Sequence, residues 1–253
     1  MKKALLFLGA FLMIAVAASA QRSETGVKPQ KTTKSTTTTE KKGGTRFNLS
    51  LGYGTQNIKM DGEKYSLSGK EGESTSGFFA GVSWDLDIAK GIGLEFADVA
   101  IAYYSGSNTS KYSEVDWETG GEYNYDIKSS VSFFNLFVSP VKFQYRYAIN
   151  DKFAVFAATG PSLEYCLSYS RKTTTTMSYS YYYYDDEETI TDTDSELPWK
   201  SLYFYWDLQG GIQFNILKLT MGTGFGLNNV IKDDSPYTAN INRPFFVKLS
   251  FVF

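Results

Sequence analysis

The segment Arg243 to Phe253 (RPFFVKLSFVF) has an apolar residue at every second position from Phe245 to Phe253. An extended strand directs successive residues to opposite faces. One face of this strand therefore carries Phe245, Val247, Leu249, Phe251 and Phe253. In a soluble protein, such an open row of aromatic residues would promote aggregation at a sheet edge. A closed barrel in a bilayer removes this problem, because lipid solvates the apolar row and both edges of the strand are paired. The segment therefore predicts a membrane-spanning β-barrel.

Seven further segments show the same alternation, at residues 47–54, 78–87, 92–104, 128–148, 153–166, 202–216 and 219–227. The alternation changes phase near Ala97-Asp98 and again at Pro140, which predicts a β-bulge at each position. Tyr and Phe number 19 each, an excess that suits strands and the aromatic girdles of membrane barrels. The mean hydropathy of −0.27 argues against a helical membrane protein and fits strands with one apolar face.

The lengths of the connections predict how these strands are joined. Three connections are tight, at residues 88–91, 150–152 and 217–218, and they alternate with four long ones, at 56–76, 105–127, 168–200 and 228–242. Outer-membrane barrels combine short periplasmic turns with long external loops. We therefore expect an all-β fold, an eight-stranded antiparallel up-and-down transmembrane β-barrel of the smallest outer-membrane size, with side chains filling its interior.

The N-terminal region predicts export. Two lysines precede an apolar run from Ala4 to Ala17, and Ala18-Ser19-Ala20 fits the small-x-small cleavage rule, so residues 1–20 are expected to be a signal peptide. Residues 21–44 are polar and rich in Thr and Lys, which predicts a disordered linker before a barrel at 45–253. We expect the barrel in the outer membrane of a Gram-negative bacterium, with the mature N-terminus in the periplasm.

The composition excludes several kinds of site. The chain has no histidine, which removes histidine metal sites and Ser-His or Cys-His catalysis. Its single cysteine, Cys166, excludes an intrachain disulfide. Without the two lysines of the signal peptide, 23 basic residues face 27 acidic ones, a net charge of −4 that does not suggest nucleic-acid binding. We expect no enzyme activity, no catalytic residues, no cofactor and no bound metal.

Charged residues on the predicted inner face form the first candidate site. Unpaired buried charges are costly, so these residues should pair and make the barrel core rigid. A narrow gated path for ions or small solutes is the alternative. Acid–base chemistry by Asp85, Asp87 and Glu95, which flank one tight turn, is a third interpretation. The full set is Asp85, Asp87, Glu95, Lys142, Arg146, Glu164, Asp207 and Lys248.

The third long connection forms the second candidate site. It combines tyrosines, which provide rigid amphipathic contact area, with carboxylates, which can bind Ca²⁺ or Mg²⁺. A solvated hairpin, a recognition surface for a glycan, a protein or lipopolysaccharide, and a cation site without EF-hand spacing are the three interpretations. The residues are Tyr181, Tyr182, Tyr183, Tyr184, Asp185, Asp186, Glu187 and Glu188.

Aromatic residues near the strand ends predict two interface girdles. The external girdle is expected to contain Tyr103, Tyr104, Tyr165, Trp199, Tyr203 and Trp206. The last strand, with Phe251 and Phe253, is also expected to act as an assembly signal that adds to an edge of the barrel-insertion machinery.

Two segments carry a family resemblance. Val131 to Tyr147 (VSFFNLFVSPVKFQYRY) and Phe153 to Tyr165 (FAVFAATGPSLEY) flank one tight turn, with Pro and Lys in the first strand and Gly-Pro in the second. This pair resembles the PorT-like outer-membrane β-barrel family of Bacteroidota. The resemblance implies the fold and the location, and it carries over no catalytic residues. We therefore expect a structural or surface-recognition barrel that contacts membrane lipid and lipopolysaccharide and uses its external loops to bind a glycan or protein; the alternative is the conduit.

Overall fold

The computed structural model describes residues 44–60, 63–65, 74–89, 91–181, 184–231 and 238–253. The predicted signal peptide and the predicted linker, except Gly44, lie outside these residues. The strands are β1 (Thr45–Met60), β2 (Glu63–Tyr65), β3 (Thr75–Ala89), β4 (Ile92–Val115), β5 (Glu122–Ala148), β6 (Phe153–Tyr181), β7 (Tyr184–Asp194), β8 (Leu202–Phe214), β9 (Leu217–Gly226) and β10 (Ala239–Val252).

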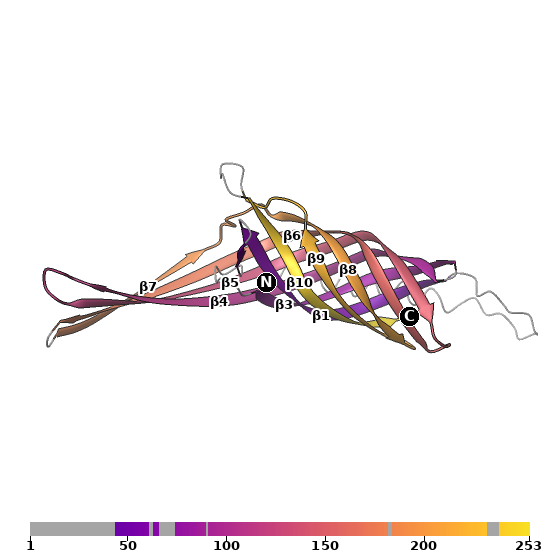
Figure 1. Ribbon diagram of the computed structural model, residues 1–253, viewed down its shortest axis with the longest axis horizontal. Coiled ribbons are helices and arrows are strands. Elements are labelled where there is room, and N and C mark those ends of the chain that lie inside the picture. Colours follow the sequence, from indigo (N-terminus) through magenta and orange to yellow (C-terminus); the bar gives the residue numbers. More distant parts are fainter. Residues whose placement is uncertain (1–43, 61–62, 66–73, 90, 182–183, 232–237) are drawn as a thin grey trace, which may run out of the picture. The chain divides into compact units, whose positions relative to one another are not determined.

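Eight of these strands close into a barrel (Figure 1). Neighbours pair antiparallel in the order β10-β9-β8-β6-β5-β4-β3-β1, and β10 then pairs with β1, with Leu249 opposite Leu51. The predicted eight-stranded up-and-down barrel is therefore confirmed. β2 pairs with β1 and β7 pairs with β6, and neither belongs to the ring.

Short connections join β3 to β4, β5 to β6, and β8 to β9 at one end of the barrel. Left-handed backbone conformations allow two of them, at Gly91 (φ 84°) and Asn215 (φ 54°). In the third, the Asn150 side-chain oxygen accepts hydrogen bonds from the amides of Lys152 and Phe153, both at 2.9 Å. The predicted tight turns are thus present, and the long connections lie at the other end.

The outer face of the barrel is apolar and exposed. Phe78, Leu51 and Phe143 expose 71%, 65% and 63% of their surface. On β4 this belt runs from Ile92 to Tyr103, and at about 3.3 Å per residue and a tilt of about 40° such a segment spans roughly 28 Å. That height matches the hydrocarbon core of a bilayer. The outer face is therefore lipid-facing, and the barrel is a transmembrane one.

No helix in the described residues is long and apolar enough to cross a membrane.

Both predicted bulges are present. Ala97 adopts a positive φ of 50°, and the pairing of β3 with β4 shifts register there. The pairing of β5 with β6 shifts between Val138 and Phe143, which brackets Pro140. These bulges allow the apolar face of each strand to stay outward although the sequence pattern changes phase.

The strands predicted at 92–104, 128–148 and 153–166 extend further than expected into the long connections at 105–127 and 168–200. β4 continues to Val115, β5 begins at Glu122 and β6 continues to Tyr181. β7 pairs back on β6, so the third long connection contains a hairpin, one of its three interpretations. Figure 1 shows these strands running on together to the left of the barrel. We call this four-stranded extension the wing: residues 106–115, 122–131, 171–181 and 184–194. Water solvates both of its faces, so its strands lack the apolar alternation that marked the others.

Candidate functional site

The barrel interior holds a chain of alternating charges. It has eight members, four carboxylates and four cations, and the charged atoms of successive members lie 2.6 to 3.7 Å apart. Every member exposes 6% of its surface or less. Strands β3, β4, β5, β8, β9 and β10 all contribute to it. The order is Asp85, Lys218, Glu95, Lys248, Asp98, Lys142, Asp207 and Arg243. Such a network offsets the cost of burying each charge and ties distant strands together.

Five of the eight predicted lumen residues belong to this chain: Asp85, Glu95, Lys142, Asp207 and Lys248. The other three do not. Asp87 and Arg146 are half-buried near the tight-turn end, where Asp87 pairs with Arg46 at 2.7 Å and with Arg146 at 3.8 Å. Glu164 is buried but accepts hydrogen bonds from the amides of Gln56 and Asn135, at 2.8 and 2.7 Å.

Three members of the charge chain are not among the lumen residues predicted from the sequence: Asp98, Lys218 and Arg243. Lys218 was placed in a turn, although it shares the inward parity of Thr220. Arg243 has the parity of the outward Phe245, but a register shift between Arg243 and Phe246 turns it inward. Pro244, which lies inside that shift, was the available signal, because proline within a strand marks a bulge.

Side chains fill the lumen around the charge chain. The cavity beside Asp98, Glu164, Asp207 and Arg243 measures about 20 Å³, room for about one water molecule. Ion passage would therefore require these side chains to move, and the conduit stays a prediction. Catalysis by Asp85, Asp87 and Glu95 gains no support, because each carboxylate is held by a cation.

Tyrosines lie above the charge chain inside the barrel. Tyr104, Tyr203 and Tyr205 expose at most 2% of their surface. The prediction that Tyr104 and Tyr203 belong to the external girdle is therefore wrong. Tyr103 faces outward and is half-exposed, and consecutive residues of a strand cannot both face lipid.

One face of the wing, which continues the lumen face of the barrel, carries a tyrosine cluster. Tyr112 and Tyr125 pair across β4 and β5 with ring centroids 4.6 Å apart and planes only 15° from parallel. Tyr123 lies 4.5 Å from Tyr179 of β6 and 6.5 Å from Tyr125. We call these four residues the tyrosine face. Trp117, in the turn between β4 and β5, exposes 93% of its surface.

Hydrogen bonds fix that turn. The Asp116 carboxylate accepts from the Thr119 hydroxyl at 2.7 Å and from the Glu118 amide at 2.9 Å. These bonds lower the pKa of Asp116 below its usual value, because they stabilise the ionised form. Thr119 also lies 3.3 Å from the hydroxyl of Tyr179. The turn that presents Trp117 is thereby tied to the tyrosine face.

The predicted recognition residues lie at the far end of the wing. Tyr181 and Tyr184 pair at the β6–β7 turn, and Tyr182 and Tyr183 lie outside the described residues. The acidic residues of the prediction belong to β7, where Asp186, Glu187 and Glu188 are exposed and Asp185 pairs with Ser180. Across the described ranges, no group of three or more metal-ligating side chains could hold a metal ion.

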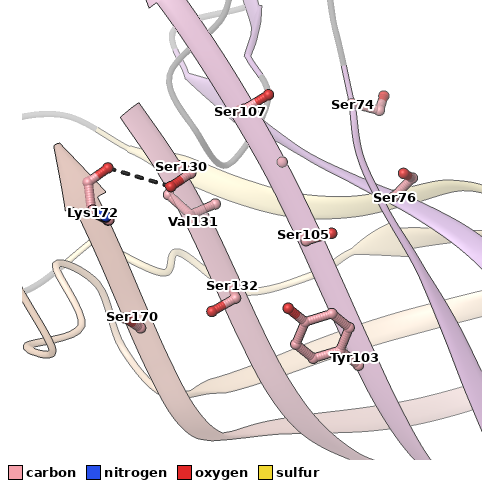
Figure 2. A pocket seen from close by; sticks show the side chains of 11 residues that line it. Ser74, Ser76, Tyr103, Ser105, Ser107, Ser130, Val131, Ser132, Ser170 and Lys172 are labelled. Atoms are coloured by element: carbon pink, nitrogen blue, oxygen red, sulfur yellow. Dashed lines mark hydrogen bonds between the residues drawn. The ribbon is translucent and has the colours of Figure 1, made fainter. Parts of the chain in front are cut away.

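The opposite face of the wing, which continues the lipid-facing side of the barrel, is hydroxylated. At its base, serines of four neighbouring strands surround a groove of about 660 Å³ (Figure 2). Ser76, Ser105, Ser132 and Ser170 occupy consecutive positions across β3, β4, β5 and β6 in one register row. We call the outward face of the wing, together with this serine row at its base, the serine face.

No family model matches the chain, and no curated protein sequence is similar to it. Among solved structures, Ail, the attachment invasion locus protein of Yersinia pestis, in complex with the heparin analogue sucrose octasulfate, has 13% identity and a TM-score of 0.33 and covers 84% of this chain and 100% of its own. Neisserial surface protein A has 10% identity and a TM-score of 0.31, covering 82% and 97%. The Pseudomonas putida toluene transporter TodX has 8% identity and a TM-score of 0.21, covering 83% and 89%.

Proposed function

We propose that this protein is an outer-membrane barrel of a Gram-negative bacterium that holds the wing outside the cell, where the tyrosine face binds a protein ligand. The stacked tyrosines at Tyr112, Tyr125, Tyr123 and Tyr179 are the observation that carries this proposal. The wing leaves the barrel at the end opposite the tight turns, and in outer-membrane barrels the tight turns are periplasmic.

The geometry of the rings favours a protein over a sugar. A sugar ring stacks on an open aromatic face, whereas Tyr112 and Tyr125 cover one face of each other at 4.6 Å. Their edges and hydroxyls remain available, which suits edge-on packing and hydrogen bonds in protein interfaces. Tyrosine also loses little conformational entropy on binding, since it has only two side-chain torsions.

The scaffold beneath this surface is rigid. β5 pairs with β4 along the whole wing, and β6 pairs with both β5 and β7. In the barrel, the charge chain from Asp85 to Arg243 ties six strands together. A preorganised surface spends little binding energy on ordering itself.

Membership of the PorT-like family and the part played by the insertion machinery stay predictions.

The test uses the full mature protein in lipid nanodiscs, screened against an array of purified bacterial surface and extracellular proteins. The double variant Tyr112→Ser/Tyr125→Ser should bind its ligand at least tenfold more weakly, because aromatic residues dominate interface energies. Asn124→Ser, on the other face of the same strand, is the matched control. Equal affinity of the tyrosine variant and the native protein would contradict the proposal.

The orientation has a separate test. Ser113→Cys places a thiol on the wing, and Asn150→Cys places one in a tight turn, whereas the native Cys166 is buried. A membrane-impermeant maleimide applied to intact cells should label the first variant alone. Labelling of the second variant alone would place the wing in the periplasm.

A further inference from the structure

The lower edge of the serine face coincides with the upper edge of the lipid-facing belt. The row Phe78, Tyr103 and Phe134 is the last aromatic row on the outer side of β3, β4 and β5. Two residues further along each strand lie Ser76, Ser105 and Ser132. The change from aromatic to hydroxyl therefore takes place within about 7 Å, the rise of two strand residues. The serine groove thus begins where lipid headgroups begin.

The hydroxyls of this row are available to a ligand. Ser76, Ser105, Ser132 and Ser170 make no side-chain hydrogen bond to any residue that the structure describes, and Ser130 donates only a long one of 3.5 Å to the backbone of Lys172. Lys172 lines the same groove. Each hydroxyl can both donate and accept, and a lysine adds a positive charge. The groove therefore offers the groups that saccharide hydroxyls and phosphates bind.

A second groove lies further along the same face. It measures about 480 Å³, and its polar lining includes Ser113, Asn124 and Thr176 together with the charged residues Lys111, Asp126 and Glu187. Ser105 and Ser113 are separated by an even number of residues on β4, so they share a face. The strand rise places them on the order of 26 Å apart. Two polar grooves in line, the first at the membrane edge, suit one linear chain that rises from the bilayer.

We propose that the serine face binds the saccharide of a lipopolysaccharide molecule in the same leaflet, whose acyl chains pack on the belt below. The first groove takes the sugars next to the lipid, and the lysine at its edge faces their phosphate groups. The second groove takes sugars further out. The leaflet assignment rests on the orientation in the proposed function, but the protein-binding tyrosines lie on the other face of the wing.

The test measures binding of purified lipopolysaccharide to the full mature protein in detergent micelles by isothermal titration calorimetry. Ser105→Leu/Ser132→Leu removes two adjacent hydroxyls and fills the groove, and it should weaken binding at least tenfold. Ser110→Leu/Thr175→Leu, on the opposite face of the wing, is the matched control and should bind like the native protein. Heat-modifiable gel migration establishes that each variant is folded. Native-like binding by the serine variant would overturn the proposal.

A second measurement identifies the source of the sugar. Saccharide released from the same lipopolysaccharide by mild acid lacks the acyl chains that the belt would hold, so it should bind at least tenfold more weakly. Equal affinity for the free saccharide would overturn assignment to a membrane lipid. Because these titrations need neither orientation nor a protein ligand, their failure is distinct from failure of the proposed function.

Discussion

Removing Lys218, the second residue of β9, should cost more stability than removing any other lumen lysine. Lys218 contacts Asp85 at 3.0 Å and Glu95 at 3.6 Å, and all three side chains are fully buried. Glu95 keeps a second cation in Lys248 at 3.0 Å. Among the described residues, Asp85 forms its ion pair with Lys218 alone. The variant Lys218→Met therefore leaves one buried carboxylate without a counter-charge.

The expected magnitude follows from this difference. Breaking a buried ion pair by removing one partner costs about 3–5 kcal/mol, and Lys218→Met should lie at the upper end. Lys142→Met should lie at the lower end, because Asp98 keeps Lys248 and Asp207 keeps Arg243. The half-buried pair at the tight-turn end offers a third point: Arg46→Met should cost about 1 kcal/mol or less, since the Asp87 side chain stays 38% exposed and keeps Arg146 at 3.8 Å.

Urea unfolding in lipid vesicles, followed by tryptophan fluorescence, measures these three losses. The double variant Lys218→Met/Asp85→Asn supplies the decisive comparison, because it removes both buried charges of the pair. It should recover most of the stability lost in Lys218→Met, as pairs replaced by neutral groups often do. A loss for Lys218→Met no larger than that for Arg46→Met, or a double variant no more stable than the single one, would refute the electrostatic reasoning.

Three further variants test the belt, the wing turn and the barrel wall. Leu49→Arg, near the middle of the belt, should destabilise the barrel by about 2–4 kcal/mol in vesicle unfolding, whereas Leu49→Ala should cost much less. Ionised Asp116 stabilises its turn and has a lowered pKa, so that stability is present above pH ~4 and is lost as pH falls through the pKa of the folded state. The fluorescence anisotropy of Trp117 should drop over the same pH range. In Asp116→Ala the anisotropy should be low at every pH. Gly211→Ala should reduce the yield of folded barrel, because a Cβ there collides with a backbone carbonyl of β9, whereas Gly210→Ala should fold.

The barrel strands were predictable because each has one face in lipid and one in a packed lumen. This asymmetry imposes period-two alternation, and even the phase changes at Ala97 and Pro140 were recognisable as bulges. The same logic failed in the wing, where both faces meet water. There β-propensity was the remaining signal, in the threonines at 173–176 and the tyrosines that follow.

The candidate sites were predictable only in part, because parity identifies a face but not a partner. Asp85 and Lys248 follow from parity, but the order of the charge chain depends on which strands face each other across the lumen. Arg243 additionally needed the bulge at Pro244. The tyrosine pairing of Tyr112 with Tyr125 depends on the β4–β5 register, which the sequence left in a loop.

The two faces of the wing follow from its continuity with the barrel. β4, β5 and β6 run from lipid into water without interruption, so their outward face contacts the lipid headgroups. On β4 this face changes from Tyr103 to Ser105 at the boundary between hydrocarbon and headgroups. The inward face never meets lipid and emerges above the closed lumen with Tyr112 exposed. One set of strands can therefore hold a membrane glycolipid on one side and a protein on the other, because both surfaces are faces of the same paired strands.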